Sequence, residues 1–155
     1  MTIYFLRHAD AEDFTTSDFD RKLTLKGLDQ ANRMGKFCVS RRIDPTTILS
    51  SPLVRARETA EIVGKHLGIE PILQDWIACG MSPSTLFEKL NARGKPESLM
   101  IVGHEPDLGI AIANFLGLED SSSLNIRKAT LTAIEAFALG PGAGVLDFCL
   151  PARLA

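Results

Sequence analysis

Long hydrophobic runs are missing from this sequence, and neither sign of charge dominates it. The longest apolar stretches span only a few residues, whereas a membrane-spanning helix needs about 20, and no basic segment followed by a long apolar run opens the chain. The 17 basic and 19 acidic residues leave a net charge of -2, which disfavours nonspecific attraction to nucleic acid or to an anionic membrane. We therefore expect neither of these partners.

Cysteine is scarce and isolated in this chain. The three cysteines, at positions 38, 79 and 149, form no CxxC pair. An odd number of widely spaced cysteines argues against a disulfide framework and against a thiolate zinc site. None is followed five residues later by arginine, so the loop of a cysteine-based phosphatase is absent. These features predict a protein of the reducing cytoplasm.

The hydrophobic pattern alternates between strands and helices. Apolar runs predict strands at 2–6, 47–49, 71–74 and 98–102, and a closing hairpin formed by 129–138 and 144–150. Helical spacing predicts helices at 24–40, 83–92 and 106–115, and another from Ser51-Pro52 to Gly68, with a serine N-cap and a glycine C-cap. This alternation predicts one α/β domain over residues 1–155, a three-layer α/β/α sandwich with a mostly parallel central sheet.

Four arginine and histidine side chains follow these strands or open these helices. Arg7 and His8 end the strand at 2–6, His104 comes just after the strand at 98–102, and Arg55 lies in the first turn of a helix. Each alone has a plain alternative: a surface pair, a satisfied buried histidine, or a solvated arginine. Ligand sites of open α/β sheets gather where strands end, so we expect the four side chains to lie close together.

Two arginines and two histidines in one pocket suit an anion. The planar donor fork of arginine matches phosphate oxygens, and a neutral imidazole is a competent nucleophile toward phosphorus. A cation in the first turn of a helix, such as Arg55, is disfavoured by the helix dipole unless an anion lies nearby. The residues themselves therefore indicate a site for a phosphoryl group.

Three motifs in this order carry a family resemblance. LRHA at 6–9, SSPLVRARETA at 50–60 and VGHEPDL at 102–108 resemble the signatures of the histidine phosphatase superfamily, which has the phosphoglycerate-mutase-like fold. The order and the short length are most similar to its small SixA-type phosphohistidine phosphatase branch. The resemblance spans residues 2–116, and the three motifs together are very specific.

The resemblance implies a role for each matching residue. His8 would be the nucleophile and become transiently phosphorylated, while Arg7 and Arg55 would hold the phosphoryl oxygens and His104 would be the second histidine of the pocket. Arg21 matches an arginine often found before the first helix of the small branch, which implies phosphate or substrate binding; its alternative is an ordinary loop cation. The mechanism implied by the family needs no metal and no cofactor.

Two positions depart from the family pattern or match it loosely. Ala9 stands where the family usually has glycine, which could crowd the loop beside the nucleophile. Asp75 is the nearest counterpart of a glutamate that donates a proton to the leaving group in many members, and its alternative is a surface carboxylate. A leaving imidazole departs readily once protonated, so a phosphohistidine substrate could dispense with a strong acid.

The expected substrate is phosphohistidine on a protein. Larger relatives often cover the pocket with insertions, but the connection from the Arg55 helix to the strand before His104 is short. An uncovered pocket would accept a side chain that projects from a protein. It would bind small esters weakly, because it offers few contacts remote from the phosphoryl group.

Several other functions stay open at this point. They are a small-molecule phosphomonoesterase of the same superfamily, a metal-dependent hydrolase with His8 and Asp10 as ligands, and a catalytically inactive phosphate-binding module. The run Asp18-Phe19-Asp20 is similar to the DxD of aspartate-nucleophile phosphatases, but no hydrophobic strand precedes it.

Overall fold

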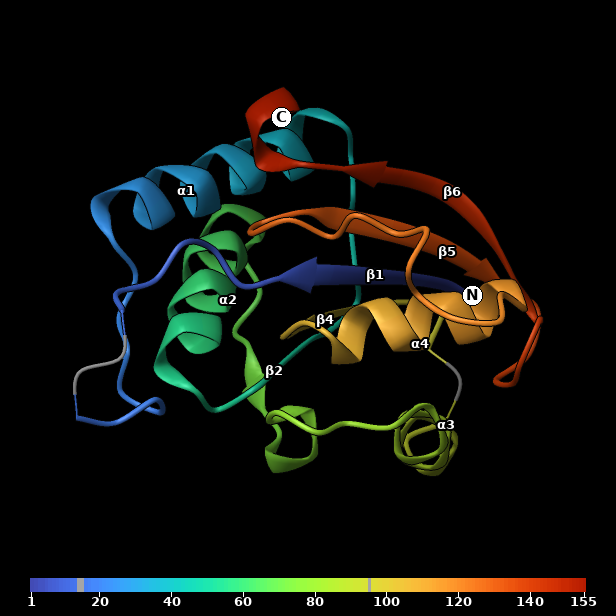
Figure 1. The fold of residues 1–155 in the computed structure, drawn as a ribbon. Coiled ribbons are helices and arrows are strands. Elements are labelled where there is room, and N and C mark those ends of the chain that lie inside the picture. Colours follow the sequence, from blue (N-terminus) through green and yellow to red (C-terminus); the bar gives the residue numbers. More distant parts are fainter. Residues whose placement is uncertain (14–15, 95) are drawn as a thin grey trace.

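The computed structural model describes residues 1–13, 16–94 and 96–155. Its elements follow the chain in an order that alternates strands and helices before a final hairpin (Figure 1). They are β1 (Thr2–Arg7), α1 (Leu25–Ser40), β2 (Ile48–Ser50), α2 (Val54–Leu67), β3 (Ile72–Leu73), the 3₁₀ helix η1 (Asp75–Ile77), α3 (Pro83–Ala92), β4 (Ser98–Gly103), α4 (Asp107–Leu116), β5 (Leu131–Ala136), β6 (Gly144–Leu150) and the 3₁₀ helix η2 (Ala152–Leu154).

One sheet of six strands, in the order β3-β2-β4-β1-β5-β6, organises the molecule. The pairs β3–β2, β2–β4 and β4–β1 are parallel, and β5 and β6 close the sheet as antiparallel neighbours. The expected α/β fold with a mostly parallel sheet is therefore confirmed. Parallel strands place their carboxyl ends at one edge, so Ser50, Gly103 and Arg7 end side by side.

Helices cover both faces of this sheet, as Figure 1 shows. On β1, Ile3 and Phe5 point into the apolar cluster under α3 and α4, whereas Leu6 points into the cluster under α1 and α2. The same alternation on β4 sends Ile101 to the first cluster and Val102 to the second. Successive side chains of a strand face opposite ways. The central strands β1 and β4 therefore contribute side chains to the apolar core on both faces of the sheet.

The start of α2 differs from the sequence expectation. The helix begins at Val54, and its N-cap residue is Leu53, which supplies no side-chain cap hydrogen bond. Ser51 was the predicted N-cap, but its hydroxyl accepts from the backbone amide of Leu53 at 3.2 Å and contacts His104. The hydroxyl of Ser51 thus closes a turn just before the helix and also contacts His104. None of the helices in the described ranges is both long and apolar enough to cross a membrane.

Candidate active site

His8 follows directly after β1 and is held in one tautomer by its own loop. Its ring nitrogen Nδ1 lies 2.8 Å from the carbonyl oxygen of Ala9. A carbonyl oxygen can only accept, so Nδ1 carries the proton and the lone pair of the neutral ring lies on Nε2. The residue is only 5% exposed. The fold thus fixes which nitrogen of the neutral His8 ring bears the lone pair.

The surroundings of His8 keep its imidazole uncharged. Burial, with smaller contributions from the charges of His104, Arg55 and Lys128, lowers the pKa of His8 to about 3, although the bond to Ala9 acts in the opposite direction. Desolvation disfavours the charged form of a group, and nearby cations add to that effect. The lone pair on Nε2 is therefore free of a proton at neutral pH.

Arg7 is held by a hydrogen bond to the loop that precedes β5. Its Nη1 donates to the carbonyl oxygen of Ile126 at 2.8 Å. The backbone amide of Ala129 lies 3.1 Å from the carbonyl oxygens of both Arg7 and His8. Ala129 has a φ of 55°, in the left-handed region that alanine rarely adopts. The 126–129 loop therefore contains one residue in a rarely adopted conformation, and it holds the end of β1 by hydrogen bonds.

Arg55 lies in the first turn of α2 and is buried, with 4% of its surface exposed. Its guanidinium donates to the backbone carbonyl of Asp18 at 2.7 Å and to the Asp18 carboxylate at 3.2 Å. This carboxylate is the anion that compensates a cation at a helix start. The Oγ of Thr59 donates to the carbonyl of Arg55 and accepts from the amide of Ala9, which ties α2 to the segment that follows β1.

His104 faces His8 from the end of β4. The two ring centroids are 5.2 Å apart, and Nε2 of His104 lies 2.7 Å from the hydroxyl of Ser51. Burial and the charge of Arg55 lower the pKa of His104 to about 4, so this ring is also neutral at neutral pH. The hydroxyl of Ser51 also accepts from Leu53, and it can donate its own hydrogen to Nε2 of His104. In that arrangement the ring proton lies on Nδ1.

Three buried nitrogens of the pocket have no hydrogen-bond partner among the described residues. They are Nε of Arg7, Nε of Arg55 and Nδ1 of His104. Buried donors without a partner are rare in folded proteins and call for an explanation. An anion with several acceptor oxygens, such as a phosphoryl group, would satisfy donors of this kind. The structure thus brings together the four residues that the sequence singled out most strongly.

Arg21 and Asp75 have other surroundings. Nη1 of Arg21 donates to the carboxylate of Asp18 at 2.9 Å, so Arg21 is linked to the pocket through the carboxylate that also contacts Arg55. Asp75 begins η1, just beyond β3, and its side chain is exposed. Within the described part of the chain it makes no side-chain hydrogen bond. The catalytic role of Asp75 stays a prediction.

The structure also adds residues that the sequence reasoning passed over. Asp18, part of the DxD pattern in the sequence, contacts both Arg21 and Arg55. Ser51, the predicted N-cap of a helix, contacts His104, and the charge of Lys128 acts on His8. An arginine in the first turn of a helix predicts an acidic partner. The sequence does not identify which carboxylate is the partner of Arg55.

Ala9 fits its position in the structure without the conformational freedom of glycine. Its side chain is fully buried in the apolar cluster beneath α1 and α2. Its φ is not among the positive values of the non-glycine residues that the structure describes, so this position does not need glycine's conformational freedom.

In the described ranges, no three His, Cys, Asp or Glu side chains are grouped so as to hold a metal ion.

Comparisons with known proteins place this chain in a family. Residues 3–77 match the Histidine phosphatase superfamily (branch 1). The chain is 32% identical over 131 residues to a phosphohistidine phosphatase SixA homolog of Haemophilus influenzae, covering 76% of this chain and 78% of that protein. The chain belongs to the histidine phosphatase superfamily, branch 1.

Within the superfamily the chain resembles SixA. It is 29% identical over 118 residues to the phosphohistidine phosphatase SixA of Escherichia coli, covering 73% of each protein. A solved structure of the protein histidine phosphatase SixA complexed with tungstate superposes with a TM-score of 0.88 at 21% identity, covering 99% of this chain and 98% of that one. The likeness to that structure concerns the fold, and it extends over nearly the whole chain.

Proposed function

We propose that this protein is a metal-independent phosphatase that hydrolyses phosphohistidine on proteins through a phospho-His8 intermediate. The observation that carries the proposal is a buried, neutral His8 whose Nε2 bears the lone pair, beside unpartnered nitrogens of Arg7, Arg55 and His104. A structural relative is described in complex with tungstate, a tetrahedral oxyanion like phosphate. That description supports an oxyanion pocket in this fold.

The reaction needs two displacements at phosphorus. Nε2 of His8 attacks the phosphorus while the bond to the substrate imidazole breaks, and the imidazole nitrogen keeps the electron pair and takes a proton from solvent. Water then attacks phospho-His8, the bond between phosphorus and Nε2 breaks with its electron pair returning to Nε2, and phosphate leaves while one proton of the attacking water returns to solvent. Arg7, Arg55 and His104 would donate to the phosphoryl oxygens in both steps, since positioning and charge stabilisation supply most of the catalysis in phosphoryl transfer.

We expect the Asp18 carboxylate to compete with a bound phosphoryl group for the charge of Arg55. His8 and Arg55 are buried, and the backbone carbonyl and the carboxylate of Asp18 accept from the two Nη atoms of Arg55. The Asp18 side chain is 49% exposed, so it has room to move. The described residues between α2 and β4 form β3, η1 and α3, so the expected absence of a long insertion there stays the basis for proposing a protein substrate.

The proposal is tested by trapping the intermediate. A phosphohistidine peptide is mixed with the protein, the reaction is quenched without acid, and mass spectrometry locates the phosphate. We expect phosphate on His8, and we expect His8→Ala to lose activity by a factor of about 10³ or more. His66→Ala is the matched control, because His66 lies on α2 and bonds Asn32 instead of the pocket. Turnover by His8→Ala at the wild-type rate would disprove the mechanism.

The substrate class is tested separately by comparing kcat/KM with and without chelator. Phosphohistidine peptide should be preferred over phosphoserine, phosphotyrosine and sugar phosphates. Its imidazole leaving group depends least on protonation by an acid of the enzyme. Asp75→Asn should leave phosphohistidine turnover unchanged and slow ester turnover by about 10²-fold, if Asp75 protonates alkoxide leaving groups. A sugar phosphate that reacts far faster than the peptide would instead identify a small-molecule phosphomonoesterase.

A further inference from the structure

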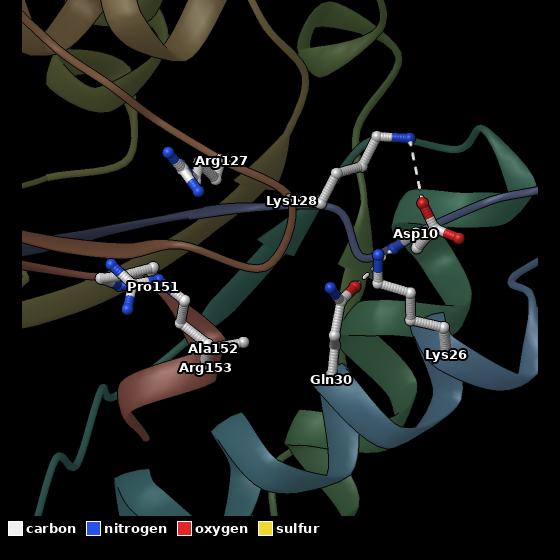
Figure 2. A pocket seen from close by; sticks show the side chains of 8 residues that line it. All are labelled: Asp10, Lys26, Gln30, Arg127, Lys128, Pro151, Ala152 and Arg153. Carbon is white, nitrogen blue, oxygen red and sulfur yellow. Dashed lines mark hydrogen bonds and ion pairs between the residues drawn. The ribbon is translucent and has the colours of Figure 1, made fainter.

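A cleft rich in basic side chains lies between Asp10, the start of α1, the loop before β5 and η2 (Figure 2). Its volume is about 360 Å³. We call it the basic cleft, and its charged and polar lining consists of Asp10, Lys26, Gln30, Arg127, Lys128 and Arg153. None of these six is among the residues to which we assign a part in phosphoryl transfer, so the cleft is a separate feature of the surface.

The basic cleft is attached to the candidate active site through the backbone. Asp10 is two residues beyond His8. Arg127 and Lys128 lie between Ile126, whose carbonyl accepts from Arg7, and Ala129, whose amide contacts the carbonyls of Arg7 and His8. The charge of Lys128 is also among those that act on His8. A ligand in the cleft would therefore lie next to a group bound at His8.

The cations of the cleft are poorly compensated by the protein itself. Figure 2 shows the Lys128 ammonium facing the Asp10 carboxylate, at 3.9 Å. The other three cations, Lys26, Arg127 and Arg153, are exposed and form no ion pair within residues 1–13, 16–94 and 96–155. The whole chain carries a net charge of -2, so this excess of positive charge is local. Such a patch attracts anions from solution.

The cations come from three different segments of the chain. Lys26 projects from the first turn of α1, Arg127 and Lys128 from the loop before β5, and Arg153 from η2. A single phosphate is best held by donors that converge on one point. Cations spread around an open cleft are better matched to several carboxylates that are themselves spread over a surface.

We infer that the basic cleft binds acidic side chains of the protein substrate, adjacent to its phosphorylated residue. This inference rests on the proposed function for the identity of the substrate. The cleft would supply binding energy remote from the reacting atoms, which a pocket made only for the phosphoryl group lacks. It would therefore select phosphorylated proteins in which aspartate or glutamate flanks the modified side chain.

The first experiment measures binding without catalysis. A fluorescently labelled hexaglutamate peptide is titrated at low salt with the wild-type protein and with the triple variant Lys26→Gln, Arg127→Gln, Arg153→Gln. We expect about ten-fold weaker binding by the variant, since exposed ion pairs each contribute roughly two- to three-fold. The control variant is Lys36→Gln, Lys65→Gln, Arg93→Gln, which removes three exposed cations outside the cleft and should bind like the wild type.

The second experiment measures turnover of two phosphohistidine peptides, one flanked by glutamates and one by alanines. The triple variant should raise KM for the acidic peptide about ten-fold, leave kcat unchanged, and leave KM for the alanine peptide unchanged. The wild-type preference should shrink between 0.05 and 0.5 M salt, because screening weakens exposed charge pairs. Lys128 is left intact because its charge acts on His8.

The outcomes separate this inference from the proposed function. If neither peptide is turned over, the proposed function fails, and the hexaglutamate titration still decides whether the cleft binds carboxylates. Equal hexaglutamate affinity in the wild type and the triple variant would overturn the inference. So would displacement of the peptide by pyrophosphate at concentrations where monomeric glutamate and vanadate have no effect, since that result would assign the cleft to a second phosphate.

Discussion

The two neutral histidines of the candidate active site should make folding strongly dependent on pH. In the unfolded chain an imidazole has a pKa near 6.5, whereas the folded structure lowers the pKa to about 3 for His8 and to about 4 for His104. Between these values the unfolded chain binds two more protons than the folded protein at these sites. The free energy of unfolding must therefore fall as the pH falls below 6.5.

The size of the effect follows from these pKa values. At pH 5 each histidine costs about 2 kcal/mol of stability relative to pH 8, so the pair costs about 4 kcal/mol. That is a large fraction of the 5 to 15 kcal/mol typical of a native domain. Both side chains are almost fully buried, so solvent does little to screen the effect.

The assay is urea unfolding followed by the fluorescence of Trp76, the single tryptophan, at pH 8, 6.5 and 5. The buffers contain no phosphate, because phosphate would stabilise the folded state by binding. His8→Asn removes one titrating ring and should halve the loss, to about 2 kcal/mol between pH 8 and pH 5. Lys65→Gln, an exposed change on α2, is the control and should show the full loss.

Equal losses in the wild type and in His8→Asn would refute the reasoning, because they would mean that His8 takes up its proton equally well in both states. The same result would weaken the mechanism, which needs a lone pair on Nε2.

Three further predictions follow from the geometry of the site. Arg55→Ala should lower kcat by about 10² to 10³, the usual loss for a preorganised oxyanion donor; an unchanged kcat/KM would show that Arg55 does not touch the reacting group. Asp18→Asn should tighten inhibition by vanadate about five-fold, since it removes a negative charge that competes for Arg55, and weaker inhibition would instead make Asp18 a positioning residue. Gly27→Ala should destabilise the fold by about 1 to 3 kcal/mol in urea unfolding, because the added Cβ would lie 1.9 Å from the carbonyl oxygen of Asp10; wild-type stability would show that α1 shifts freely.

Much of the fold could be read from local patterns. The predicted helices at 24–40 and 83–92 and the strand at 71–74 agree with α1, α3 and β3 to within one or two residues. Gly68 has the left-handed φ of 72° expected of a helix C-cap. Elements of this kind are set by hydrophobic periodicity and by residues that act over one turn, so neighbouring sequence contains the needed information.

The start of α2 shows where local reasoning fails. Ser51-Pro52 has the local pattern of a helix start, but Ser51 uses its hydroxyl on His104, which is 53 residues away in the chain. A capping rule compares only nearby groups. It does not include a contact between this hydroxyl and a distant histidine.

Local sequence is enough to predict the alternation of strands and helices, the three motifs, and the four residues that the structure brings together. Because parallel strands end at one edge of a sheet, the predicted sheet also places Arg7, His8 and His104 in one region. The folded structure is needed to show which nitrogen of His8 carries the proton, which carboxylate faces Arg55, and that cations from three segments meet in the basic cleft. These features depend on contacts between residues far apart in the chain and on burial, and burial exists only after the chain has folded.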